Sequence, residues 1–319
     1  MEHEKIIEGD ALESLKSIGA GTVNCCITSP PYFGLRDYGV EGQIGLEQTP
    51  EAYVQKLVEI FREVKRVLKK EGTLWLNLGD SYSNEKVGNT ETRIHKKAVQ
   101  NTYKKGTSGL PHKNLLGIPW RVAFALQADG WYLRQDIIWH KPNPMPESVT
   151  DRCTKAHEYI FLFSKSPHYY FNNEAIKEPV KEVSLKRIEY GWHGKGDHGQ
   201  GNYAGLPQTD KMGSRFCNPN GRNKRSVWTV TTKPFSGAHF ATFPEALIEP
   251  MILAGCPERG LVLDPFFGAG TTGVVAKKLG RDYLGIELNP AYIKIATDRL
   301  NGITTNLFSP AKLSTSHGA

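Results

Sequence analysis

The stretch Val23-Asn-Cys-Cys-Ile-Thr-Ser-Pro-Pro-Tyr32 joins an apolar, β-branched run to a rigid turn. The run is typical of a buried strand, and the prolines end it because proline has no N–H to continue a strand ladder. The turn consists of Ser29, Pro30, Pro31 and Tyr32. It offers a hydroxyl, carbonyl acceptors and a flat ring, which together suit a planar base that carries an amine. A strand-end turn with a core tyrosine explains the same four residues, so this stretch alone does not settle the function.

Composition narrows the class of protein. A chain of 319 residues can form one large domain with an insertion, or two domains, and its formal charge of +7 is compatible with a polyanionic partner. The five cysteines are odd in number and form no Cys-x-x-Cys pair, so neither a disulfide framework nor a metal site is indicated. The charged N-terminus and the lack of a long apolar run predict a soluble cytoplasmic protein with no membrane partner.

Hydrophobic periodicity predicts alternating strands and helices. The expected strands are residues 5–7, 23–28, 73–78, 131–133, 137–139, 158–163, 261–264 and 283–287. Helices are expected at 11–18, from the cap Thr49 to the stop Gly72, from 119 to Gly130, up to Gly255, up to Leu279 and from Pro290 to Leu300. Strands separated by helices indicate an α/β fold with a mostly parallel sheet.

A second loop carries a glycine pattern. Gly268, Gly270 and Gly273 match G-x-G-x-x-G between a strand and a helix, and Glu287 ends the next strand. Glycines allow a close approach of the backbone to a ligand, and the acid can accept hydrogen bonds from ribose hydroxyls. The pattern predicts a nucleotide-type site, although it does not separate NAD from S-adenosylmethionine.

The position of this loop near the end of the chain constrains the topology. A dinucleotide enzyme needs several further strand–helix units, but only one strand and one helix follow here. Strands from the N-terminal half must therefore complete the sheet, which places Asp10 and the Ser29 turn at neighbouring strand ends beside the glycine loop. A cofactor and an amine-bearing base that face each other in one crevice predict methyl transfer.

Between the two halves, from about residue 166 to 234, regular periodicity disappears. Basic residues such as Arg215 and Arg222 alternate with aromatic residues such as Trp192 and Tyr203. This mixture favours contacts with nucleic acid, although a loosely packed loop with scattered charges explains it as well. We predict a catalytic half at 1–165, an inserted recognition region at 166–235, a cofactor half at 236–305 and a flexible tail at 306–319.

Together, Thr28-Ser-Pro-Pro-Tyr32 and Asp264-Pro-Phe-Phe-Gly-Ala-Gly-Thr271 resemble the motifs of the permuted β group of amino-methylating DNA methyltransferases. The resemblance spans roughly Lys5 to Leu300. It implies a Rossmann-like, circularly permuted sheet that uses S-adenosylmethionine, with an inserted target-recognition region. It also implies a cofactor site formed by Asp10, His239, Phe240, Thr242, Asp264, Phe266, Gly268, Gly270, Thr271 and Glu287.

The resemblance also sharpens the chemistry of the first turn. Ser29 and the carbonyl of Pro30 would accept both N–H bonds of an exocyclic amine and aim its lone pair at the methyl group, while Tyr32 stacks on the flipped base. Members of the group with serine at the first position mostly resemble cytosine N4 methylases, whereas aspartate is commoner among adenine N6 enzymes. We therefore expect N4-cytosine methylation of DNA, with adenine N6 methylation as the alternative.

Other interpretations remain open from the sequence. They are a glutamine-modifying methyltransferase, a nicotinamide oxidoreductase and an inactive DNA-binding module. The partners to expect are DNA, and in this group also a second copy of the chain or a separate restriction endonuclease.

Overall fold

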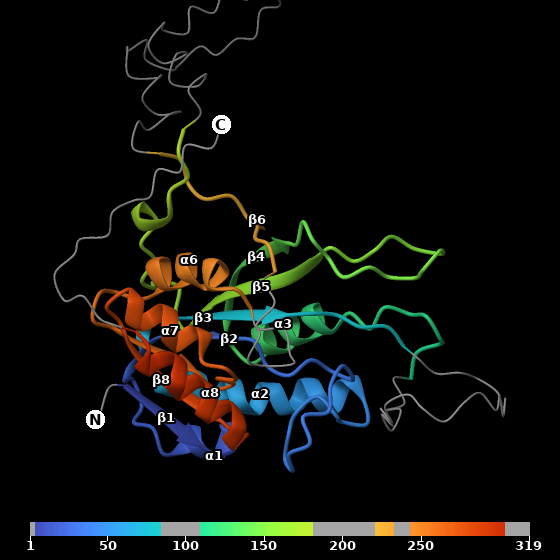
Figure 1. The fold of residues 1–319 in the computed structure, drawn as a ribbon, viewed down its shortest axis with the longest axis horizontal. Coiled ribbons are helices and arrows are strands. Elements are labelled where there is room, and N and C mark those ends of the chain that lie inside the picture. Colours follow the sequence, from blue (N-terminus) through green and yellow to red (C-terminus); the bar gives the residue numbers. More distant parts are fainter. Residues whose placement is uncertain (1–3, 84–108, 181–220, 233–242, 304–319) are drawn as a thin grey trace, which may run out of the picture. The chain divides into compact units, whose positions relative to one another are not determined.

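The computed structural model describes residues 4–83, 109–180, 221–232 and 243–303, which are coloured in Figure 1. Their contacts divide the chain into two units, Met1–Phe171 with Ser226–Ala319, and Asn172–Arg225. In the second unit, the described residues form the short 3-10 helix η1 (Glu174–Ile176) and a bridge between Glu178 and Arg222. In the described ranges, no helix is long and apolar enough to cross a membrane.

The first unit contains an eight-stranded sheet in the order β1-β8-β7-β2-β3-β5-β4-β6. Its strands are β1 (Glu4–Glu8), β2 (Val23–Thr28), β3 (Leu68–Leu78), β4 (Tyr132–His140), β5 (His157–Ser164), β6 (Val227–Thr229), β7 (Leu261–Asp264) and β8 (Asp282–Glu287). All neighbouring pairs are parallel except those of β5, which runs against β3 and β4. The fold is therefore the mixed α/β sheet of a Rossmann-like protein, as the sequence predicted.

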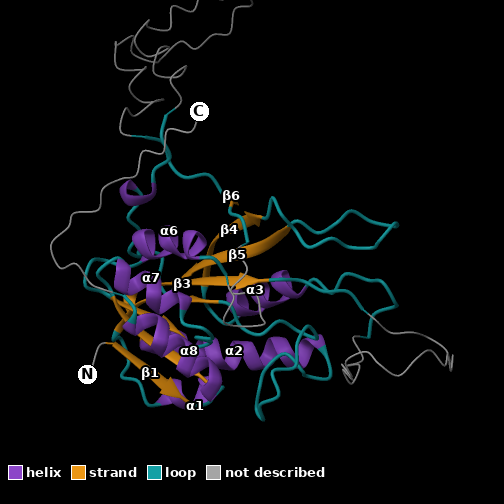
Figure 2. Ribbon diagram, viewed as in Figure 1, coloured by secondary structure: helices purple, strands orange, loops and turns teal. Residues whose placement is uncertain are grey.

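Helices cover both faces of this sheet (Figure 2). They are α1 (Ala11–Lys16), α2 (Pro50–Val67), α3 (Ile118–Ala128), α6 (Glu245–Gly255), α7 (Thr271–Lys278) and α8 (Pro290–Asn301). Successive strand residues point to opposite faces. Cys26 accordingly joins the core that α1, α2 and α3 cover, whereas Cys25 lies against Gly255 of α6. Both faces of the central strands are buried, which explains their continuous apolar sequences.

The pairing of β2 with β7 brings a strand from the N-terminal half of the chain beside a strand from the C-terminal half. Cys25 pairs with Val262 and Cys26 with Leu263, so β2 and β7 end side by side. On the far side of β7, β8 pairs with both β7 and β1. The N-terminal strands therefore complete the sheet, as predicted. The prediction that Asp10 and the Ser29 turn follow neighbouring strands was wrong, because β8 and β7 lie between β1 and β2.

Two predicted boundaries were wrong. The helix expected to run to Gly72 ends at Val67, because Thr22 N–H donates to the carbonyl of Val67 at 2.9 Å and Leu68 already pairs with Val23. The strands expected at 131–133 and 137–139 form the single strand β4, whose register against β5 shifts between Leu133 and Gln135. In both cases the hydrogen bonds of neighbouring strands override the local pattern.

Candidate active site

A cavity of about 550 Å³ opens at the carboxyl ends of the parallel strands. Of the predicted site residues, the cavity is lined by Asp10, Ser29, Pro30, Pro31, Tyr32, Phe266, Gly268, Thr271 and Glu287. Asp264 and Gly270 stand behind this surface. His239, Phe240 and Thr242 lie outside the described residues, but Phe243, which directly follows them, lines the cavity. The two loops singled out in the sequence thus face one space.

The glycine loop follows β7 and turns into α7. Gly268 and Gly270 adopt the left-handed backbone conformation, with φ of 50° and 75°. A Cβ at Gly270 would lie 2.8 Å from Cβ of Ala296, and one at Gly285 would lie 2.3 Å from Cγ of Phe267. Gly270 is therefore needed for both its conformation and its packing, and Gly285 for packing alone. Phe267 locks the loop onto β8, while Gly268 faces open space.

Glu287 holds the glycine loop from the end of β8. Its Oε2 accepts a hydrogen bond from the backbone N–H of Gly268 at 2.7 Å, and its Oε1 accepts one from Asn289 at 2.8 Å. Burial raises the pKa of this carboxyl above its ordinary value. Each carboxylate oxygen can accept more than one hydrogen bond, so Glu287 can also accept from a ligand hydroxyl in the cavity.

Asp264 is buried, with 1% of its surface exposed. Its Oδ1 accepts from the Thr28 hydroxyl at 2.6 Å and from the Phe266 N–H at 3.0 Å, and its Oδ2 accepts from the Thr272 hydroxyl at 2.7 Å. Burial raises the pKa of Asp264 to about 6. The carboxylate therefore ties the end of β2 to the glycine loop instead of lining the cavity.

Asp10 lies at the N-terminus of α1, two residues after the end of β1. Its Oδ1 accepts hydrogen bonds from the backbone N–H groups of Leu12 and Glu13, at 2.9 and 3.0 Å. The residue thus caps the helix and lines the cavity at once.

Contacts with α2 and with the residue after β3 hold the Pro-Pro turn in place. The hydroxyl of Tyr53 donates to the carbonyl of Pro31 at 2.8 Å. A Cβ at Gly79 would lie 2.5 Å from the ring of Tyr32, so only glycine lets this ring rest on the end of β3. Tyr32 is therefore held at a fixed angle at the wall of the cavity.

A polar cluster that the sequence did not predict surrounds Tyr32. Its hydroxyl donates to Oε2 of Glu158 at 2.6 Å, and Nδ2 of Asn77 donates to Tyr32 at 2.8 Å and to Glu158 at 2.9 Å. Ser29 Oγ donates to the Tyr32 hydroxyl at 3.3 Å, and Lys141 pairs with Oε1 of Glu158. A hydrogen-bond chain thus runs from Ser29 through Tyr32 to a carboxylate.

Burial, and after it the nearby Glu158, raises the pKa of the Tyr32 phenol well above its ordinary value. The phenol therefore keeps its proton and can donate it to Glu158. The sequence signal that could have revealed this cluster was a polar Asn77 inside an apolar strand. Asn77 is 2% exposed, and its Oδ1 makes no hydrogen bond among the residues described.

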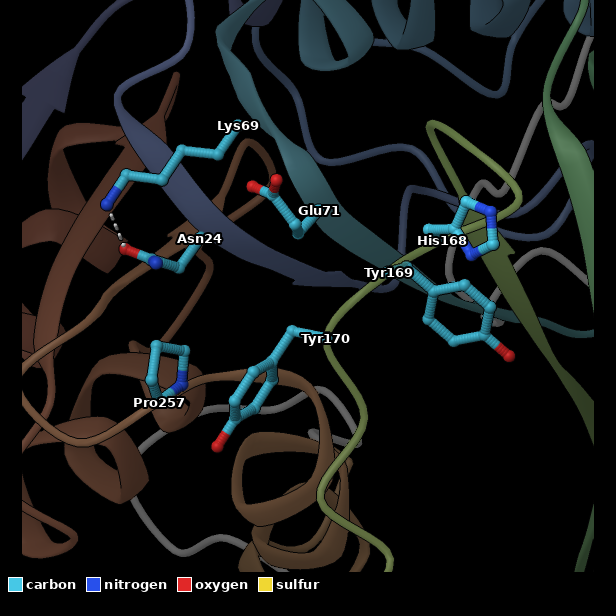
Figure 3. A pocket seen from close by; sticks show the side chains of 8 residues that line it. Asn24, Lys69, Glu71, His168, Tyr169, Tyr170 and Pro257 are labelled. Atoms are coloured by element: carbon cyan, nitrogen blue, oxygen red, sulfur yellow. Dashed lines mark hydrogen bonds between the residues drawn. The ribbon is translucent and has the colours of Figure 1, made fainter.

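A second, smaller cavity of about 340 Å³ lies at the opposite, amino ends of β2 and β3 (Figure 3). Lys69 lies beside it and donates to Oδ1 of Asn24 at 3.1 Å. None of the predicted site residues lines this cavity.

The sheet and the two facing loops place the protein among the methyltransferases with a Rossmann-like fold, which use S-adenosylmethionine. The chain belongs to the N6/N4 DNA methylase family, whose model matches residues 23–298. It is therefore a DNA methyltransferase, and the oxidoreductase and glutamine-modifying interpretations no longer apply.

Two type II methyltransferases are similar in sequence to nearly the whole of this chain. The type II methyltransferase M.Cfr9I of Citrobacter freundii is 47% identical over 303 residues, which cover 95% of this chain and 89% of that protein. M.SmaI of Serratia marcescens is 46% identical over 297 residues, 93% of this chain and 90% of that protein. Among solved structures, the cytosine-N4-specific PvuII DNA methyltransferase superposes with a TM-score of 0.61 over 96% of this chain and 88% of its own. Because it is 19% identical, it bears on the fold alone.

Proposed function

We propose that the protein transfers a methyl group to the N4 amine of a cytosine flipped out of DNA. The observation that carries this proposal is the Ser29 turn, which faces the glycine loop across one cavity. Ser29 Oγ and the carbonyl of Pro30 accept the two amine N–H bonds and draw the nitrogen lone pair out of conjugation with the ring. The Pro31 carbonyl is already bonded to Tyr53, which supports assigning the amine to Pro30.

The cavity suits the cofactor. Its volume of about 550 Å³ lies in the usual range of small-molecule sites. Gly268 leaves space for a ligand close to the backbone, and Glu287 is positioned by two backbone N–H groups to accept from a ribose. We assign the cofactor contacts to Asp10, Phe266, Gly268, Thr271 and Glu287, with Asp264 and Gly270 shaping the loop. The cofactor contacts predicted for His239, Phe240 and Thr242 lie outside the described residues. When bound, S-adenosylmethionine supplies an electrophilic methyl group.

The polar cluster provides a path for the proton that the amine must release. Asn77 adds a buried acceptor, Oδ1, at the cavity wall. As the new N–C bond forms, one amine proton passes to Ser29 Oγ, the Ser29 proton passes to the Tyr32 oxygen, and the Tyr32 proton passes to Glu158. The 3.3 Å hydrogen bond from Ser29 to Tyr32 and the 2.6 Å hydrogen bond from Tyr32 to Glu158 support this sequence of steps. At the end of the path, the ammonium group of Lys141 pairs with Oε1 of Glu158.

Glu158→Gln removes the acceptor at the end of this path and is expected to slow single-turnover methyl transfer about 100-fold. Tyr32→Phe keeps the stacking ring but breaks the chain, so the Tyr32→Phe and Glu158→Gln losses should not add in the double variant. The measurement is the single-turnover rate with saturating cofactor. Fully additive losses would show that Glu158 acts independently of Tyr32.

The base is identified by one experiment. The purified protein is incubated with unmethylated DNA and methyl-labelled S-adenosylmethionine, and the digested nucleosides are separated by mass spectrometry. Label in N4-methylcytosine supports the proposal. Label in N6-methyladenine would replace it with the alternative, while an unlabelled digest would contradict both.

We assign recognition of the DNA sequence to residues 166–235. The related proteins are named type II methyltransferases, which supports a separate restriction endonuclease as a functional partner. DNA modified by this chain should then resist cleavage by that endonuclease. A homodimer remains part of the proposal, tested by the mass of the protein in solution with and without DNA.

A further inference from the structure

The connection between β4 and β5, residues 141–156, reaches out beyond the ends of both strands (Figure 1). It is closed at its base, where the backbone N–H of Lys141 donates to the carbonyl of Ala156 at 2.8 Å. Asn143 ties it to Thr232 by two hydrogen bonds, of 3.0 and 3.1 Å. These contacts make it a braced arm.

The arm presents one large apolar side chain to solvent. Met145 stands between Pro144 and Pro146 and is 85% exposed, the most of any large apolar side chain among the residues described. The next most exposed, Val227 and Phe124, reach 57% and 56% and lie in a strand and a helix. A proline on each side restricts the backbone of Met145, so its side chain is held in an exposed position.

Met145 also lines the cavity that holds the Ser29 turn. Nothing in the described parts of the chain covers this side chain. A base extruded into this cavity leaves a vacant position in the duplex, and an exposed side chain at the cavity opening is a candidate to occupy it. Its unbranched, adaptable chain can fill a flat gap between neighbouring base pairs.

We propose that Met145 inserts into the DNA at the position from which the target base is flipped. By filling the gap, it offsets part of the cost of unstacking the target base, as apolar wedges do in DNA-kinking proteins. The braced arm keeps the side chain presented before DNA arrives. This inference rests on the proposed function, because it concerns the same flipped base.

The test uses two duplexes that share the methylated site, one fully paired and one with an abasic position opposite the target base. Met145→Ala is expected to slow single-turnover methylation of the paired duplex about tenfold. On the abasic duplex, where extrusion is cheaper, the loss should shrink to less than about threefold. Met145→Leu keeps most of the apolar volume and should behave like the wild type on both.

Phe124→Ala is the matched control, since Phe124 is an exposed apolar residue on α3 that does not line the cavity. Leu35→Ala tests the other exposed apolar residue of the cavity, which is 47% exposed. Equal loss for Met145→Ala on both duplexes, no loss on either, or the rescue pattern in Leu35→Ala instead would overturn the assignment. If the wild type methylates neither duplex, the proposed function itself fails, so the two failures are distinguishable.

Discussion

Replacing Ser29 with alanine is expected to slow methyl transfer about 100-fold to 1,000-fold, the scale seen when one preorganised hydrogen-bonding group is removed from an active site. An exocyclic amine is a poor nucleophile because its lone pair is conjugated with the ring. Ser29 Oγ is the acceptor that counters this, and it is also the first link in the chain to Tyr32. Alanine removes both roles at once.

The measurement is a single-turnover rate, with cofactor affinity determined separately by calorimetry. Cofactor affinity should stay unchanged, because the glycine loop and Glu287 are untouched. Ser29→Thr, which restores a hydroxyl, should recover part of the rate. Ser17→Ala is the control, as the exposed Ser17 hydroxyl bonds only its own helix. Full activity in Ser29→Ala would refute the assigned role.

The sequence was sufficient to predict the starts of helices, because these depend on residues that are close together in the chain. Thr49 caps α2 as predicted, accepting from the N–H of Ala52, and α8 begins at Pro290 as predicted. By contrast, α2 ends at Val67 because the next residue, Leu68, pairs with Val23 of β2. The amphipathic pattern continues as far as Lys69, so it does not predict this end.

The same distinction holds for the site. The turn at Ser29 and the acid Glu287 could be predicted because parallel strands end at one edge of a sheet. Glu158 could not, since it reaches the cavity on β5, the strand that runs against its neighbours. Antiparallel insertion and its register, with Leu78 opposite Tyr159, arise from packing between distant segments. Lys141 and Asn77 become functional candidates only once Glu158 is placed.

Asp264→Ala is expected to destabilise the fold by about 3 kcal/mol, because it leaves three buried donors without their acceptor. These donors are the hydroxyls of Thr28 and Thr272 and the N–H of Phe266. Loss of this anchor should also loosen the loop from Phe266 to Gly268 and weaken cofactor binding by about tenfold or more. Urea unfolding gives the first quantity and calorimetry the second.

The pH dependence identifies the carboxyl itself. Burial raises the pKa of Asp264 from its ordinary value of 3.8 to about 6, so the folded state binds the proton more tightly than the unfolded state. The stability that wild type gains from Asp264 is therefore greatest at low pH and falls as pH rises from about 4 to about 6, then levels off. The difference in stability between wild type and Asp264→Ala should be larger at pH 4.5 than at pH 7.5. Taking this difference cancels most of the contribution of Glu287, whose pKa is raised in the same direction.

Thr272→Val separates the effect of one hydrogen bond to Asp264 from the effect of the carboxyl group itself. It removes one hydrogen bond to Oδ2 but keeps the carboxyl, so it should cost about 1 kcal/mol and preserve the pH dependence. If Asp264→Ala bound the cofactor as tightly as wild type does, the carboxylate would not be what shapes the glycine loop. If it lost cofactor affinity without losing stability, Asp264 would act on the cofactor directly, and its place behind the cavity wall would have to change on binding. The expected combined loss of stability and affinity follows only from a carboxylate that holds the end of β2 and the glycine loop together.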